Sequence, residues 1–206
     1  MIVVLDYGIG NLRSAEKALQ HVGADAALVS DPAKARSAHG VVLPGVGAFG
    51  RCMEALRASG LDAVADEAVS DGKPFLGVCV GMQMLYEGSD EAPGVAGLGL
   101  LPGVASLIPG DVKRPQMQWN RLDVVSPGCP LLEGLSHPTW VYFVHSYAAP
   151  LGGDVIATCD YGGRLAAVVG RGRTWATQFH PEKSGSAGLA LLANFAGIVQ
   201  RSVVAT

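Results

Sequence analysis

The sequence predicts a single α/β domain over residues 1–206, with an open, mixed, mostly parallel sheet and helices on both faces. Three observations favour this fold class. Strand-like apolar runs alternate with helical patterns through the first half of the chain, an order typical of a parallel sheet covered on both faces. Hydrophobic residues make up 49% of the chain and charged residues only 16%, so much of it must be interior. The length of 206 residues suits one such domain better than two.

The elements follow in order along the chain. Strands are expected at 2–6, 27–30, 40–44 and 74–79, and helices at 11–22, 51–59, 61–70 and 80–87. From residue 100 the pattern becomes β-rich, and we interpret 122–125, 139–144, 155–158, 165–169 and 174–179 as returning strands or antiparallel additions. Residues 188–201 form a closing amphipathic helix, with one apolar stripe made of Leu189, Leu192, Phe195 and Val199.

Charge and composition argue against several classes of protein. The formal net charge is −3 and no basic cluster occurs, so we expect no nucleic-acid partner. Met1 opens directly onto a strand-like run without the basic and apolar regions of a signal peptide, and no apolar run reaches membrane-spanning length. The four cysteines contain no C-x-x-C pair and the histidines show no metal spacing. We therefore expect a reduced, cytoplasmic protein with no metal site, no cofactor and no membrane contact.

The residues that could do chemistry follow predicted strands. In open α/β sheets ligands bind beyond the carboxyl ends of the strands, so four junctions matter: Asp-Tyr-Gly-Ile-Gly-Asn at 6–11, Pro-Gly-Val-Gly at 44–47, Gly-Val-Cys-Val-Gly at 77–81 and Phe-His-Pro-Glu at 179–182.

Cys79 lies between two glycines where a strand passes into a helix, as the serine does in a nucleophile elbow. At that turn the sulfur would stand at a helix N-terminus, whose partial positive charge favours the thiolate. Taken alone, the pentapeptide also suits a small buried cysteine in a glycine-rich strand.

His180 and Glu182 end the last predicted strand. Residues i and i+2 face the same way in extended chain, and Pro181 keeps His180 extended. Glu182 would then orient the imidazole and stabilise its protonated form. A solvated turn would explain His-Pro-Glu in isolation, but together with the cysteine elbow the pattern predicts Cys-His-acid nucleophilic catalysis.

Acyl transfer also needs donors for an oxyanion. The backbone N–H groups of Val80 and of the loop at Val46 and Gly47 are candidates, although Pro-Gly-Val-Gly is equally typical of an ordinary turn. Further polar contacts to a substrate would come from Gln83, His145, Ser146 and Tyr147.

Gly8-Ile9-Gly10 invites a dinucleotide-binding interpretation, because it follows a strand and opens a helix. Arg13 occupies the place of the third glycine, and no Gly-Lys-Ser/Thr phosphate loop occurs. A nucleotide cofactor therefore has little support.

The motifs together resemble the class I glutamine amidotransferases, which combine Gly-x-Cys-x-Gly-Met-Gln, here at 77–83, with Phe-His-Pro-Glu at 179–182. Within that family, four blocks look like the glutaminase subunits of imidazole glycerol phosphate synthases: Asp-Tyr-Gly-x-Gly-Asn-Leu at 6–12, Pro-Gly-Val-Gly-Ala-Phe at 44–49, Tyr-Phe-Val-His-Ser-Tyr at 142–147 and Gln-Phe-His-Pro-Glu-Lys-Ser at 178–184. The resemblance runs the whole length of the chain.

The resemblance implies a flavodoxin-like sheet and a catalytic triad of Cys79, His180 and Glu182. It also implies that glutamine is hydrolysed to glutamate and that ammonia passes through a channel to a (β/α)₈-barrel cyclase subunit in a heterodimer of histidine biosynthesis. The cyclase would make imidazole glycerol phosphate and aminoimidazole carboxamide ribotide, so the complex is a lyase. Two other functions stay open: a stand-alone cysteine hydrolase and a non-catalytic nucleotide-binding subunit.

One segment departs from the family pattern. The family usually has Pro-His-Met-Gly-Trp-Asn, where this chain has Pro-Gln-Met-Gln-Trp-Asn at 115–120. The family places this segment near the partner, so Met117, Trp119 and Asn120 are expected interface residues, and Gln116 and Gln118 are the changed positions.

Overall fold

The computed structural model describes residues 1–204; the last two residues of the predicted domain lie outside this range. Five strands form the parallel half of a nine-stranded sheet, in the order β2 (Ala26–Val29), β1 (Ile2–Leu5), β3 (Gly40–Gly45), β4 (Phe75–Cys79) and β12 (Thr174–Thr177). Strands β1, β3, β4 and β12 are buried at every residue. Continuous apolar strands of this kind are typical of a parallel sheet covered on both faces.

The antiparallel half continues from β12 through β11 (Arg164–Arg171), β10 (Val155–Asp160), β7 (Gln116–Val124) and β8 (Thr139–His145). A small three-stranded sheet of β5 (Gly88–Ser89), β6 (Val104–Leu107) and β9 (Tyr147–Ala148) lies beside it. The antiparallel additions expected after residue 100 are confirmed. Strand β7 begins at Gln116, however, six residues before the predicted strand, and the sequence did not predict β6.

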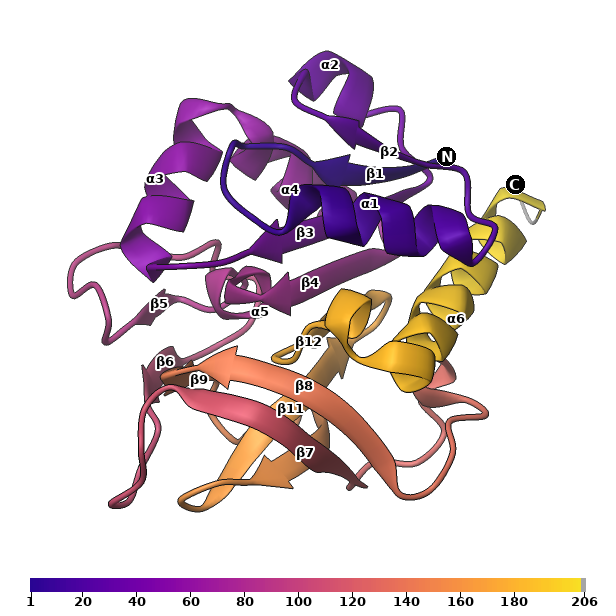
Figure 1. Ribbon diagram of the computed structural model, residues 1–206. Helices are drawn as coiled ribbons and strands as arrows, with labels where there is room; N and C mark the ends of the chain where they lie inside the picture. Colours follow the sequence, from indigo (N-terminus) through magenta and orange to yellow (C-terminus); the bar gives the residue numbers. More distant parts are fainter. Residues whose placement is uncertain (205–206) are drawn as a thin grey trace.

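Helices cover both faces of the parallel half. In Figure 1, α1 (Leu12–His21) crosses in front of the strands and contacts α6 (Gly185–Val204), while α3 (Phe49–Ala58) and α4 (Leu61–Ser70) pack together on the opposite side. Shorter pieces are α2 (Pro32–Ala35), α5 (Val80–Met84) and the 3₁₀ turns η1 (Pro130–Leu132) and η2 (Pro181–Lys183). The predicted α/β class with helices on both faces is confirmed. Within residues 1–204 no helix is long and apolar enough to cross a membrane.

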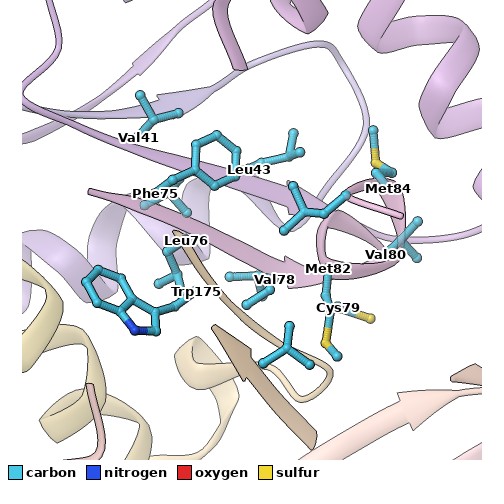
Figure 2. Packing of buried hydrophobic residues seen from close by; sticks show 14 of the residues in the cluster. Val41, Leu43, Phe75, Leu76, Val78, Cys79, Val80, Met82, Met84 and Trp175 are labelled. Carbon is cyan, nitrogen blue, oxygen red and sulfur yellow. The ribbon is translucent and has the colours of Figure 1, made fainter. Parts of the chain in front are cut away.

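The core lies between the sheet and these helices. Its largest fully buried side chains include Phe49, Phe75, Phe143, Phe179 and Phe195, each worth roughly 1.5–3 kcal/mol when removed from water. Figure 2 shows Leu43 on β3 beside Phe75 on β4, Leu76 and Val78 on the other side of that strand near Trp175, and Cys79 at the end of β4. This packing fixes the carboxyl ends of β3 and β4, where the predicted chemistry is placed.

Candidate active site

Cys79 stands on a sharp turn between β4 and α5. Its φ of 56° and ψ of −112° make it the one non-glycine residue with positive φ in the part of the chain that the structure describes. A Cβ added to Gly77 would lie 2.9 Å from the Gly81 carbonyl oxygen, and one added to Gly81 would lie 1.9 Å from the Leu43 carbonyl oxygen. Both glycines are therefore required by close backbone packing, and strain at Cys79 is of the kind that persists at functional sites.

His180 follows β12, which lies directly beside β4 and parallel to it, with Thr177 opposite Val78. The His180 backbone N–H donates to the Tyr142 carbonyl at 3.1 Å. Ser184 Oγ donates to the His180 carbonyl at 2.6 Å and accepts the Tyr142 N–H at 3.0 Å. Strand β8 and the Ser184 hydroxyl thus fix the backbone on which the imidazole stands.

The His180 ring is held between a sulfur and a carboxylate. Its Nδ1 lies 2.8 Å from Glu182 Oε1, and both side chains are almost fully buried, at 4% and 3% exposure. The other ring edge, carrying Nε2, is left for Cys79, whose sulfur donates to the Val144 carbonyl at 3.8 Å and accepts from Gln178 Nε2 at 3.9 Å. Asn11, which the sequence reasoning missed, donates from Nδ2 to the same Glu182 oxygen at 3.0 Å.

The charges of this group reinforce one another. Burial disfavours a charged imidazole, but the hydrogen bonds and negative charges of Cys79 and Glu182 outweigh it and raise the pKa of His180 to about 10. Burial likewise opposes ionisation of Glu182, yet His180 and Asn11 hold the pKa of that carboxyl below its usual value. At neutral pH the site therefore favours a His180 imidazolium beside the Glu182 carboxylate.

A cleft of about 470 Å³ opens above this group, a volume suited to a small-molecule substrate. It is lined by nine of the residues singled out from the sequence: Val46, Gly47, Cys79, Val80, Gln83, His145, Ser146, Tyr147 and His180. Glu182 lies behind His180. The six other lining residues, to which the sequence assigned no role, are Gly10, Asn11, Glu91, Pro115, Val144 and Lys183.

The loop at 44–47 lies against the elbow. A Cβ on Gly45 would approach the Gly81 nitrogen to 2.7 Å and Val80 Cβ to 3.0 Å, whereas Gly47, at φ 82°, has open space beside it. This contact puts the backbone of the loop next to the first residues of α5. The N–H groups named from the sequence as oxyanion donors therefore share one wall of the cleft.

The polar residues around the cleft also bind one another. Gln83 Nε2 donates to the Tyr147 carbonyl at 2.9 Å and to Gln178 Oε1 at 3.1 Å. His145 faces the same carbonyl through Nδ1 at 2.8 Å and the Gln116 side chain through Nε2 at 2.9 Å. These contacts fix the wall on which the Ser146 backbone lies.

Burial, aided by the charge of His180, lowers the pKa of His145 to about 4 despite its bond to Tyr147. The ring is then neutral at pH 7 and carries a single N–H. With Nδ1–H donating to Tyr147, Nε2 must accept, but the structure places Gln116 Oε1 at 2.9 Å from it and leaves the buried Gln116 Nε2 without a hydrogen-bond partner. Turning the amide over exchanges its oxygen and nitrogen and presents the NH₂ to the ring. Gln116, the family departure, is thus a donor to His145, whereas Gln118 on the same strand is exposed.

Of the expected interface residues, Met117 and Trp119 are exposed at 61% and 49%. They lie on the outer face of the β7–β8 pair, where Trp119 is opposite Tyr142. Asn120 is half-buried, and its Nδ2 donates to the Asp160 carbonyl at 2.9 Å. Its side chain therefore ties β7 to the end of β10.

Within residues 1–204, no three His, Cys, Asp or Glu side chains lie close enough to hold a metal ion. The Gly8-Ile9-Gly10 turn leads to Asn11, whose side chain donates to the Glu182 carboxylate. The arrangement supports nucleophilic attack by the Cys79 sulfur, with the His180 imidazolium nearby.

Comparison with known proteins agrees with this chemistry. The family model described as "Glutamine amidotransferase class-I" matches residues 3–198. The chain belongs to this family. Membership in the class I glutamine amidotransferases confirms the resemblance drawn from the motifs and identifies the chain as an enzyme of glutamine hydrolysis.

Individual relatives within the class I glutamine amidotransferases share one more specific name. A Methanothermobacter thermautotrophicus protein named imidazole glycerol phosphate synthase subunit HisH is 48% identical over 97% of this chain and 100% of its own length. A Bacillus cereus protein of the same name is 44% identical over 97% of this chain and 96% of its own.

Among solved structures, one described as a glutamine amidotransferase superposes with a TM-score of 0.74 at 23% identity, covering 95% of this chain and 98% of its own. PurLQS from Thermotoga maritima superposes at 0.71 with 18% identity, covering 96% and 97%. These two likenesses show the shared fold.

Proposed function

We propose that this chain is the glutaminase subunit of an imidazole glycerol phosphate synthase and that Cys79, His180 and Glu182 are its catalytic triad. The observation that carries the assignment is the strained Cys79 elbow beside the buried His180–Glu182 pair. Relatives at 44% and 48% identity over nearly the whole chain carry that subunit name.

In the first half-reaction the Cys79 thiolate attacks the side-chain amide carbon of glutamine. The tetrahedral oxyanion accepts hydrogen bonds from the Val80 N–H and from the loop at Val46 and Gly47. The His180 imidazolium donates its Nε2 proton to the leaving nitrogen as the C–N bond breaks. Ammonia departs and a γ-glutamyl thioester remains on Cys79.

In the second half-reaction the neutral His180 takes a proton from water as that water attacks the thioester carbon. The same N–H groups hold the second oxyanion. When the C–S bond breaks, its electron pair returns to the Cys79 sulfur, and glutamate is released. Glu182, fixed by Asn11, keeps the imidazole oriented and stabilises its charged form in both halves.

Glu91 is the proposed partner for the α-ammonium group of glutamine. Its carboxylate reaches the cleft wall, and Oε2 already accepts the Phe49 N–H at 2.8 Å. That bond fixes the side chain at the start of α3 and leaves its other oxygen for a cation. Gln83, His145, Ser146 and Tyr147 form the facing wall.

The ammonia is proposed to pass to a (β/α)₈-barrel cyclase subunit in a heterodimer. Met117 and Trp119 supply exposed apolar surface for such a contact, and aromatic and methionine side chains are enriched in protein interfaces. A cytoplasmic location of the complex stays a prediction.

The test is glutamate release from glutamine by the purified chain, alone and with the cyclase subunit of the same organism plus its nucleotide ligand. Strong stimulation by the partner that disappears in Cys79→Ala is expected. Equal activity with and without the partner would favour a stand-alone hydrolase. Glutaminase activity that survives Cys79→Ala, or none under any condition together with tight nucleotide binding, would contradict the assignment.

A further inference from the structure

Two buried side chains hold the loop at 44–47 from the side of the core. The Tyr7 hydroxyl donates to the Pro44 carbonyl at 2.6 Å, and the Cys52 thiol donates to the Val46 carbonyl at 3.2 Å. Cys52 is fully buried and Tyr7 is 6% exposed. They come from different elements, the end of β1 and the first turns of α3, and converge below the loop.

Both groups stay protonated and so remain donors. Burial raises the pKa of the Cys52 thiol, and it raises that of the Tyr7 hydroxyl far above its usual value, with further contributions from the neighbouring Cys52 and Cys79. A protonated pair of this kind is a fixed feature of the core at the pH at which enzymes usually work.

The two carbonyls determine where the loop directs its N–H groups. A trans peptide is planar, with its C=O and N–H pointing in opposite directions. With the Val46 carbonyl aimed at Cys52, the Gly47 N–H points away from the core, on a residue that lines the cleft. The peptide that carries the Val46 N–H lies between two anchored peptides, so its plane is constrained at both ends.

We propose that Cys52 and Tyr7 are positioning residues for the oxyanion-binding loop, which aim its backbone N–H groups at the carbonyl oxygen of the substrate. This inference rests on the proposed function of Cys79 as the nucleophile. Neither side chain touches the substrate. Their effect therefore falls on the step in which negative charge develops on oxygen, rather than on substrate binding.

The experiment compares Cys52→Ala, Cys52→Ser and Tyr7→Phe in the chain together with its cyclase subunit and nucleotide ligand. A complete loss of one oxyanion donor typically costs about a hundredfold or more in kcat, so a misaimed donor is expected to cost about tenfold or more. The KM for glutamine should stay within about twofold, because ground-state contacts are unchanged. Cys52→Ser keeps a donor and should recover most of the kcat lost in Cys52→Ala.

A second readout separates the loop from the nucleophile. Alkylation of Cys79 by iodoacetamide, followed by mass spectrometry of its peptide, forms no oxyanion, so its rate should be unchanged in all three variants. Cys129→Ala removes a half-buried thiol that directly precedes η1 and lies away from the cleft. This variant should retain wild-type kcat. If Cys52→Ala does not fold, Tyr7→Phe supplies the same measurement.

Wild-type kcat in both Cys52→Ala and Tyr7→Phe would overturn the proposal, as would equal kcat losses in Cys52→Ala and Cys52→Ser. Loss of Cys79 alkylation in parallel with kcat would also overturn it, because the effect would then lie on the nucleophile. Failure of the proposed function would give a different result: the wild-type protein would lack glutaminase activity, or Cys79→Ala would keep it.

Discussion

The side-chain amide of Asn11 donates a hydrogen bond to Glu182 Oε1 at 3.0 Å, the same oxygen that lies 2.8 Å from His180 Nδ1. One carboxylate oxygen is thereby fixed from two sides. Asn11→Ala should lower kcat for glutamine hydrolysis by about tenfold with little change in KM, because one charged-group hydrogen bond is worth roughly 1.5–3 kcal/mol. Steady-state kinetics with the cyclase partner present would measure this.

Asn194→Ala is the matched control for Asn11→Ala. Asn194 Nδ2 donates to the Leu131 and Glu133 carbonyls, and both acceptors are remote from the triad. Its kcat should equal that of wild type. A kcat in Asn11→Ala that matches the control would show that Glu182 is oriented without the amide.

The pH dependence of catalysis should reflect the His180–Glu182 pair. The pKa of His180 is raised to about 10 by Cys79 and Glu182 against the effect of burial, so its proton is available to the leaving ammonia until the pH rises through that value. Glu182→Gln removes one negative charge. The alkaline limb of kcat/KM should therefore shift to lower pH, in addition to a lower maximum. If the alkaline limb of kcat/KM does not shift in Glu182→Gln, that limb reflects the titration of a group other than His180.

His145 should make the protein less stable in mild acid. Its folded pKa is about 4, below the roughly 6.5 of an unfolded chain. Between these values the unfolded state binds more protons, so the free energy of unfolding falls as pH falls from 6.5 to 4. The contribution is on the order of 3 kcal/mol. In His145→Gln, urea unfolding between those pH values should have a shallower pH dependence than wild type; an equal slope would contradict this.

Glu91→Gln should act on substrate binding. Removing its charge takes away the proposed partner of the glutamine ammonium group, while the amide oxygen can still accept the Phe49 N–H. The KM for glutamine should rise by about tenfold, which corresponds to roughly 1.4 kcal/mol. Glu54→Gln, an exposed change on helix α3, whose first N–H binds Glu91, is the control. Glutamine analogues without the α-amino group should lose their disadvantage in Glu91→Gln; an unchanged ratio would exclude the contact.

The sequence predicted the strand ends well because their requirements are local. Gly77 and Gly81 are needed by the turn itself, and His180 and Glu182 are two positions apart in extended chain. In both cases residues that are adjacent in the sequence suffice to predict the geometry. The predicted helix at 80–87 nevertheless ends at Met84. The strand at 116–124 was mostly missed, because its apolar Met117 and Trp119 are exposed whereas the polar Gln116 is buried, the reverse of the usual pattern.

The residues that support the proposed triad, the loop at 44–47 and the cleft could not be predicted from the sequence. Asn11 is 171 positions from Glu182, and Tyr7 is 37 positions from the carbonyl that it holds. Glu91 reaches the cleft from the irregular segment after β5. Each role depends on close approach in the folded chain, and a single amide, hydroxyl or carboxylate has no pattern by which to be found.

The pairing of β4 with β12 also has a consequence for biosynthesis. Cys79 leaves the ribosome long before His180, since β12 comes from the last part of the chain. Until that strand inserts beside β4, Cys79 has no imidazole beside it and only part of its cleft. The proposed nucleophile thus acquires its histidine partner only when the sheet is completed, at the end of synthesis.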